Sequence, residues 1–233
     1  MKPLYIYFLA ASLAFTSCSD SWLDLNPSTS VPTDQAFSSL EDAQSALNGI
    51  YRLASAHSYY GDNFFYFGDC RAADVQARMT KGDGRRVSPY YEYNVKATDS
   101  FNSSLPWNQV YKVIRQTNNL IAATESGLIK TTDEAALNEI KAQALAMRGL
   151  ALYDLIRVFA MPYSYDNGQS LGVPIVTTAT DQSSKPARNT VAECYDQIIT
   201  DLTGSLAGLS KEKKDGCLNY WAVQGIPQKV YLT

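Results

Sequence analysis

The sequence predicts a mainly α-helical fold in which helices pack in pairs and long irregular loops connect them. Apolar residues recur at spacings of three and four in several separate segments, and this is the period of one face of an α-helix. Ser or Thr residues with the spacing of a capping box precede three of these segments. Ala and Gly are frequent on the apolar faces, and such small residues let two helix axes approach closely.

The first two predicted helices lie within residues 33–57 and after Trp107. Ser39 followed by Asp42 resembles a capping box with Asp in place of Glu. Gly127 suits the end of the second helix, because glycine readily adopts the left-handed conformation common there. The apolar stripes are Ala43, Ala46, Leu47, Ile50 and Tyr51 in the first helix and Val110, Ile114, Asn118 and Ile121 in the second.

A longer helix and its successor come next. Thr131 and Glu134 predict a capping box for the long helix, which we expect to end before Pro162. Thr190 and Glu193 predict another capping box after the short apolar run "GVPIVT". The expected stripes are Leu137, Ile140, Ala144, Met147, Ala151, Leu155 and Val158, and then Val191, Tyr195, Ile198, Leu202, Leu206 and Leu209. Arg148, Tyr153 and Tyr195 also fall on these helices and are expected to make packing or helix-pair contacts.

Residues 219–232 form a last segment with a helical pattern. Pro227 lies within it and is expected to kink or break the helix, because proline lacks a backbone N–H and its ring clashes with the preceding turn. Paired helices of this kind resemble tetratricopeptide repeats, although no clean self-similarity of roughly 34 residues can be shown. We therefore expect a mainly α fold with TPR-like helical repeats and long irregular loops.

The N-terminus predicts a lipoprotein signal peptide over residues 1–17. Lys2 precedes an uncharged run from Pro3 to Phe15, which has the build of a secretory signal and is shorter than the roughly 20 residues of a membrane span. Small residues precede Cys18, so we expect cleavage there and acylation of Cys18, which would anchor the protein to a membrane. The alternative is an ordinary secreted protein in which Cys18 merely lies near the cut.

Residues 18–32 are then a polar tether, and residues 33–233 form one helical domain. The formal charge of −3 provides no basic field, so nucleic acid is not an expected partner. Cys70, Cys194 and Cys217 are too few and too widely spaced for a disulfide framework or a metal site. Cys194 falls on a predicted helix, where it is expected to act as a small apolar filler.

The segment from 58 to 106 has no clear periodicity and contains several Gly and Pro residues, so it is expected to be mostly loop with short helical pieces. A loop of this length inside a domain is uncommon and usually functional. The chain has 16 tyrosines and only 8 phenylalanines, and the tyrosines cluster as "YYGDNFFYFG" at 59–68, "YYEY" at 90–93 and "YSY" at 163–165. These clusters lie between the strongly periodic segments.

Catalytic and metal-binding motifs are absent from the sequence. His57 is the only histidine, and its position at a predicted helix end favours a surface or capping role. No G-x-S-x-G, H-E-x-x-H, P-loop or dinucleotide fingerprint occurs. Asp69 and Asp74 share a loop, but the sequence does not set the distance that a glycosidase needs between two carboxylates. We predict no catalytic residues, no metal and no cofactor.

Four ordered stretches resemble the SusD/RagB family of outer-membrane nutrient-binding lipoproteins. The first, "CSDSWLDLNPSTSVPTDQAFSSLEDAQSALNGIY", is similar to the family's lipid cysteine, tether and first helix. The others are "LPWNQVYKVIRQTNNLI", "AQALAMRGLALYDLIRVFAMPY…LGVPIVT" and "RNTVAECYDQIITDLTGSLAGL". Together they span residues 18 to 209. Members of the family are considerably longer, so this chain looks like either an N-terminal fragment or a truncated gene product, and we expect residues 18–233 alone to be marginally stable.

The resemblance implies glycan capture at the cell surface without catalysis. Such proteins bind an oligosaccharide or polysaccharide and deliver it to a SusC-like TonB-dependent transporter, while a lipid anchor holds them on the outer membrane. Aromatic side chains with neighbouring polar groups suit the apolar faces and polar edges of sugars. The candidate carbohydrate-binding residues in the long loop are Asp74, Arg85, Arg86, Tyr90, Tyr91, Tyr93 and Asn94.

Three alternatives stay open at this point. Several of the loop tyrosines could pack the loop onto the helices instead of binding sugar. The protein could be a pure interaction subunit, a helical-repeat lipoprotein whose partner is only the transporter. It could also be a glycoside-acting enzyme that uses Asp69 or Asp74.

Overall fold

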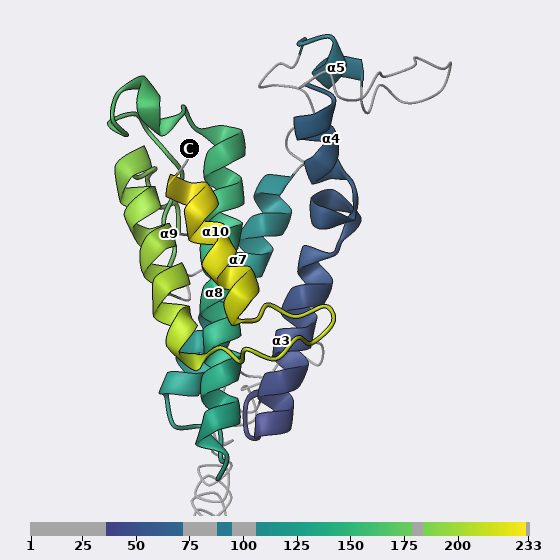
Figure 1. The fold of residues 1–233 in the computed structure, drawn as a ribbon, viewed down its shortest axis with the longest axis vertical. Coiled ribbons are helices and arrows are strands. Elements are labelled where there is room, and N and C mark those ends of the chain that lie inside the picture. Colours follow the sequence, from purple (N-terminus) through teal and green to yellow (C-terminus); the bar gives the residue numbers. More distant parts are fainter. Residues whose placement is uncertain (1–35, 72–87, 95–105, 179–183, 232–233) are drawn as a thin grey trace, which may run out of the picture. The chain divides into compact units, whose positions relative to one another are not determined.

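The computed structural model describes residues 36–71, 88–94, 106–178 and 184–231 (Figure 1). The chain divides into two units, Met1–Ala36 and Phe37–Thr233. The predicted signal peptide, Cys18 and the tether therefore lie outside the described residues. The described part of the second unit is helical and contains no β-strand, with only two isolated bridges, which confirms the mainly α fold.

Five longer helices carry this fold, and the sequence pattern located each of them. The helices are α3 (Leu40–Ala54), α7 (Pro106–Glu125), α8 (Glu134–Phe159), α9 (Val191–Ser205) and α10 (Tyr220–Tyr231). Shorter elements lie between them: η2 (His57–Gly61), α4 (Asn63–Asp69), α5 (Ser88–Tyr91), η3 (Tyr163–Tyr165) and η4 (Leu206–Gly208).

Consecutive long helices pack against each other in antiparallel pairs (Figure 1). Between α7 and α8, Lys141 pairs with Glu125 at 2.8 Å, and further along Arg148 bonds to Asn118 at 2.9 Å. The residue numbers run in opposite directions along this contact, so the helices are antiparallel. Between α8 and α9, Arg148 bonds to Asp201, while Gly208 just beyond α9 lies beside Ala142. This arrangement confirms the predicted stacking of helix pairs.

The outer helices join the same stack. Gln109 of α7 donates to the Leu53 carbonyl of α3 at 2.8 Å, and α10 packs against both α9 and α8. Tyr51 connects α3 to α8 and to the segment before α10. Its hydroxyl donates to Gln143 at 2.8 Å and accepts from the Leu218 N–H at 2.9 Å.

Two of the three predicted capping boxes are present. At α3, Ser39 accepts from the Asp42 N–H at 3.2 Å, and Asp42 accepts from the Ser39 N–H at 3.0 Å. Thr190 and Glu193 make the same reciprocal pair at α9. Hydrogen bonds from Ser39 and Ser38 lower the pKa of Asp42, and those from Thr190 lower the pKa of Glu193. Both carboxylates therefore stabilise their helix starts in the ionised form.

The predicted capping box of Thr131 and Glu134 is wrong. The cap of α8 is Asp133, whose carboxylate accepts from the Ala136 N–H at 2.9 Å. Thr131 accepts from the Asp133 N–H at 3.0 Å and closes a turn before the helix. Asp caps a helix as well as Thr does, and the pattern alone did not distinguish two acceptable caps only two residues apart.

Pro227 was expected to kink or break the last helix, and the break does not occur. Helix α10 continues through Pro227 to Tyr231. A proline at this position removes one backbone hydrogen bond, the one to the Val223 carbonyl. Pro227 is buried, so its ring packs inside the helix stack.

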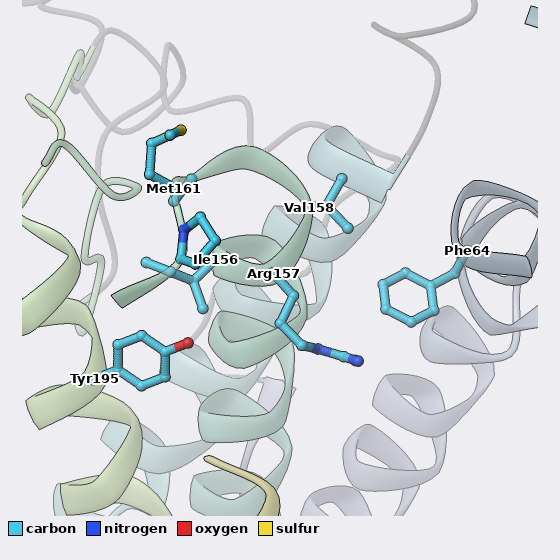
Figure 2. Close-up of a pocket in the computed structure, with 9 residues that line it drawn as sticks. Phe64, Ile156, Arg157, Val158, Met161 and Tyr195 are labelled. Carbon is cyan, nitrogen blue, oxygen red and sulfur yellow. The ribbon is translucent and has the colours of Figure 1, made fainter. Parts of the chain in front are cut away.

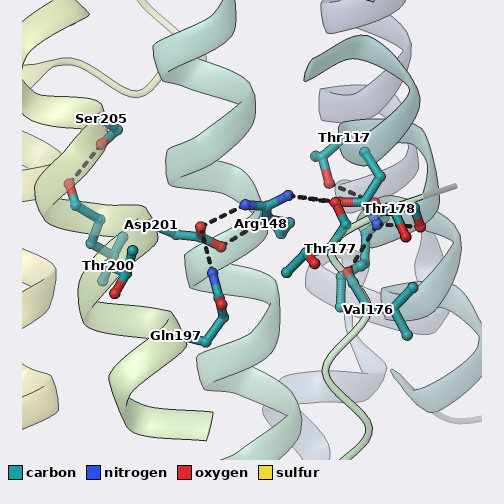
Figure 3. A network of polar contacts seen from close by, with 12 residues as sticks. Thr117, Arg148, Val176, Thr177, Thr178, Gln197, Thr200, Asp201 and Ser205 are labelled. Carbon is teal, nitrogen blue, oxygen red and sulfur yellow. Dashed lines mark hydrogen bonds and ion pairs between the residues drawn. The ribbon is translucent and has the colours of Figure 1, made fainter. Parts of the chain in front are cut away.

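A buried polar network holds three helices and an extended segment together (Figure 3). The Arg148 guanidinium forms two hydrogen bonds to the Asp201 carboxylate, at 2.8 and 2.7 Å, and a third to Asn118. Asn118 in turn donates to the carbonyls of Val176 and Thr178, at 2.9 and 3.3 Å. The network fixes residues 176–178 against α7 and α8.

Small residues allow α8 and α9 to approach this closely. A Cβ atom added to Gly149 would lie 3.0 Å from the Leu202 Cγ atom and 3.1 Å from the Asp201 Cβ atom. Cys194 is fully buried on α9, and its thiol donates to the Val173 carbonyl at 3.3 Å, which confirms its expected role as a small filler.

Gly168 holds the turn after α8, and substituting it is expected to destabilise the protein. Its φ of +76° favours glycine, and an added Cβ would lie 2.6 Å from the Tyr163 ring and 2.9 Å from the Ala192 nitrogen. We expect Gly168→Ala to lower the free energy of unfolding by at least about 1–2 kcal/mol. Urea unfolding of the purified protein measures this change.

Gly204 of α9 provides a control of opposite sign. No atom lies within 4 Å of the position of its missing Cβ, so Gly204→Ala is expected to stabilise the helix by about 0.5–1 kcal/mol. Equal unfolding midpoints for the two variants would contradict the assigned role of Gly168.

Candidate functional site

The residues that the sequence nominated for sugar binding fall into two groups. Asp74, Arg85 and Arg86 lie outside the described residues, so they stay predictions. Tyr90 and Tyr91 lie on α5 and Tyr93 and Asn94 follow it, which brings four of the seven nominated residues together on one short segment. The exposure of these four residues differs.

Tyr93 and Asn94 are exposed, whereas Tyr90 is buried. The Tyr93 side chain is 69% exposed, and its hydroxyl donates to the Arg71 carbonyl just beyond α4. Tyr91 is half-buried. Tyr90 is 1% exposed, and this burial raises the pKa of its hydroxyl to about 12. A ring buried in this way has no free face for a sugar, so the packing alternative fits Tyr90.

A second aromatic cluster lies on η2 and α4 and is formed by Tyr59, Tyr60, Phe64 and Phe65. The Tyr59 and Tyr60 rings stack with centroids 4.1 Å apart. The Phe64 ring meets both of them edge-on, at 5.7 and 5.6 Å, a favourable geometry for aromatic pairs. The cluster is visible in the sequence as "YYGDNFF", but the sequence pattern did not predict a hydrogen-bond partner for the two tyrosine hydroxyls.

Asp154 of α8 is that partner. Its buried carboxylate accepts from the Tyr59 hydroxyl at 2.6 Å and from the Tyr60 hydroxyl. Its other oxygen accepts from the Arg157 guanidinium. Burial, followed by the nearby Asp154 charge, raises the pKa of both tyrosines far above its usual value. Both hydroxyls therefore stay protonated and act as donors, which attaches η2 to α8.

Arg157 lies where the aromatic cluster meets the end of α8. Its guanidinium carbon is 4.6 Å from the centre of the Tyr153 ring and 5.3 Å from that of Phe64, within the range of cation–π contacts. Burial lowers the pKa of Arg157, but the Asp154 charge and hydrogen bond outweigh it and leave the pKa above the usual value. The group is therefore permanently charged and held on one side by Asp154.

A pocket of about 430 Å³ opens beside Arg157 (Figure 2). Phe64 lies on one side of it and Tyr195 on the other, with Arg157 between them. Aliphatic atoms from the end of α8 and from the segment after it complete the lining, which includes Ile156, Val158, Ala160, Met161 and Pro162.

The turn after α8 supports the Tyr195 side of the pocket. Tyr163 packs edge-on against Tyr195, with ring centroids 5.7 Å apart. The Gly168 N–H donates to the Tyr163 carbonyl at 3.1 Å, and the Ala192 N–H of α9 donates to the Gly168 carbonyl at 2.9 Å. These bonds tie the turn to the start of α9, so the pocket wall is built from fixed elements.

The sequence pattern did not predict this pocket. It assigned Arg148, Tyr153 and Tyr195 to helix packing, which is confirmed for Arg148 and for Tyr153, whose side chain is 4% exposed. Tyr195 is half-buried and also lines the pocket. The walls come from three segments far apart in the chain, and the only signal in the sequence was the clustering of tyrosines at 59–68 and 163–165.

Few other chemical groups gather in the described part of the chain. No three His, Cys, Asp or Glu side chains lie together there as a metal site requires. His57 pairs with Asp62 at 2.8 Å and is 60% exposed, in keeping with the predicted surface role. Asp69 is exposed at the end of α4. Among the described helices, none is both long enough and apolar enough to cross a membrane.

The chain matches a known protein family over most of its length. Residues 21–232 match the SusD-like family described as "Starch-binding associating with outer membrane". The chain belongs to the SusD-like family. The family resemblance stated from the sequence is thereby confirmed, and carbohydrate binding and outer-membrane association are the properties by which the family is described.

Individual SusD-like relatives agree with the fold. A SusD superfamily protein from Bacteroides thetaiotaomicron is 63% identical with a TM-score of 0.79 over 83% of this chain and 42% of its own. One from Bacteroides vulgatus is 32% identical with a TM-score of 0.77 over 84% and 43%. SusD-like protein P2 of Formosa agariphila is 31% identical over 87% of this chain and 37% of its own length. This chain thus spans about two fifths of the relatives it matches.

Proposed function

We propose that this SusD-like protein is a cell-surface lipoprotein that binds glycans without catalysis and delivers them to a SusC-like TonB-dependent transporter. The match to a starch-binding, outer-membrane family over residues 21–232 carries this proposal. The anchor would be an acyl group on Cys18, which lies in the segment outside the described residues.

The loop around α5 supplies the proposed contacts on the described part of the chain. Tyr93 and Asn94 are exposed and adjacent, and Tyr91, two residues before Tyr93, is half-buried. An exposed tyrosine ring can pack against the apolar face of a sugar, while an amide can donate to and accept from its hydroxyls. Asp74, Arg85 and Arg86 remain proposed contacts from the same long loop.

Affinity electrophoresis tests the binding function. A gel containing soluble starch, laminarin or another neutral polysaccharide is expected to retard the wild-type protein. Tyr93→Ala is expected to weaken binding by about threefold to tenfold, because one aromatic contact contributes about 0.5–1.5 kcal/mol beyond its area. Tyr231→Ala is the matched control, since Tyr231 is also 69% exposed but lies on α10.

Each competing function has a distinct outcome. Absence of retardation by a broad glycan panel would contradict glycan binding. Copurification with a large outer-membrane β-barrel, without any effect of Tyr93→Ala, would favour a pure interaction subunit. Glycan turnover that Asp69→Asn abolishes would indicate an enzyme.

A further inference from the structure

We infer that the pocket between α4, the end of α8 and Tyr195 is a second sugar-binding subsite that takes one unit of a neutral glycan chain. This inference rests on the proposed glycan-binding function and extends it to residues outside the long loop. The subsite is defined by Phe64, Arg157, Met161 and Tyr195.

The walls of the pocket combine aromatic surface with few polar groups, a composition that suits a sugar ring. Two aromatic side chains, Phe64 and Tyr195, face the pocket from opposite sides (Figure 2). A sugar ring offers apolar C–H faces, which pack well against aromatic surfaces. The volume of about 430 Å³ lies within the range of pockets that bind small molecules. Apolar walls with few polar groups are the usual composition of such sites.

Arg157 supplies the polar edge and is already positioned. A guanidinium has five N–H donors, and among the described residues Asp154 is its one hydrogen-bond partner. The side chain is 41% exposed, so it can reach a ligand in the pocket. Contacts with the Tyr153 and Phe64 rings and with Asp154 hold it in place. A side chain fixed before binding loses little conformational entropy when the ligand arrives.

The charge around the pocket favours a neutral ligand. Asp154 lies against Arg157 and is fully buried, so its negative charge offsets the guanidinium charge at short range. The chain as a whole carries a formal charge of −3. An anionic sugar would gain little net attraction at this site, whereas hydroxyl groups would still accept from the guanidinium N–H groups.

Saturation-transfer NMR with maltose and laminaribiose tests the inference on the full chain. Met161→Trp is expected to block the pocket, because Met161 lines it and is 46% exposed, so a larger side chain need not disturb the core. Tyr195→Ala removes one wall. Each variant is expected to weaken disaccharide binding about tenfold, while Tyr231→Ala, on α10, should bind as the wild type does. A thermal melt of each variant checks that it is folded.

The outcomes separate this inference from the proposed function. If Met161→Trp and Tyr195→Ala bind like the wild type, the subsite is wrong, while glycan retardation that Tyr93→Ala weakens would leave the proposed function standing. If no glycan binds the wild type, both are wrong. Tighter retardation by acidic polygalacturonate than by starch would overturn the neutral preference.

Discussion

Replacing Asp201 by alanine is expected to lower the free energy of unfolding by about 3–5 kcal/mol. The Asp201 side chain is 2% exposed and that of Arg148 is 10% exposed, and two hydrogen bonds join them. Removing the carboxylate leaves the guanidinium buried without its counter-charge, which costs more than the pair contributed. Urea unfolding followed by circular dichroism measures the change.

The expected loss is large because the network also positions the chain after α8. Arg148 bonds to Asn118 and to the Thr177 carbonyl, at 2.9 and 3.2 Å. Without Asp201, the Arg148 guanidinium is expected to move toward solvent and to lose its hydrogen bonds to Asn118 and to the Thr177 carbonyl. We therefore expect unfolding of the whole helix stack at lower urea concentration, because these contacts span α7, α8 and α9.

Two further variants make the experiment decisive. Asp196→Ala removes an exposed carboxylate from the same helix and is expected to change stability by less than about 0.5 kcal/mol. The double variant Arg148→Met with Asp201→Leu replaces the buried pair with apolar groups and is expected to recover most of the loss. If Asp201→Ala unfolds at the same urea concentration as Asp196→Ala, the buried pair does not stabilise the fold.

The helices themselves could be predicted because their signals are local. The capping boxes at Ser39 and Thr190 depend on residues three positions apart, and both occur as predicted. The apolar stripes also follow from a fixed period, and Leu47, Ile50, Val110 and Ile198 are all buried. Every one of these features is set within one or two helical turns.

Contacts between distant residues could not be predicted in this way. Arg148 was expected to contact a neighbouring helix, but its partners Asn118 and Asp201 lie 30 and 53 residues away, and no periodicity specifies such a pairing. Tyr90 was nominated for sugar binding beside Tyr93, yet one is buried and the other exposed. Side chains in an aperiodic loop have no pattern that assigns them to one face.

The pocket also could not be predicted, because contacts between distant residues form it. Its walls are brought together by the pairing of α8 with α9 and by the hydrogen bonds of Tyr59 and Tyr60 to Asp154. Because Asp154 lies 95 residues from Tyr59, the sequence pattern showed the aromatic cluster but not the carboxylate that accepts its hydrogen bonds. The role of Asp154 can be tested separately from the rest of the fold.

Replacing Asp154 by alanine is expected to release η2 and α4 from α8. Three donors lose their acceptor at once: the hydroxyls of Tyr59 and Tyr60 and the guanidinium of Arg157. Tyr59 is fully buried, and a buried donor left without a partner costs about 1–3 kcal/mol. Arg157 is 41% exposed and can turn to water, so its contribution is smaller. We expect a total loss of about 3–4 kcal/mol.

The distribution of this loss distinguishes Asp154 from Asp201. Local opening exposes only the elements that the broken contacts held. Hydrogen exchange followed by mass spectrometry is therefore expected to accelerate in residues 57–69, while the amides of α7, α8 and α9 keep their protection. Asp69→Ala, which removes an exposed carboxylate at the end of α4, should leave exchange in the same segment unchanged. Uniform acceleration across all helices in Asp154→Ala would instead mean that this carboxylate supports the whole stack and not the aromatic wall of the pocket alone.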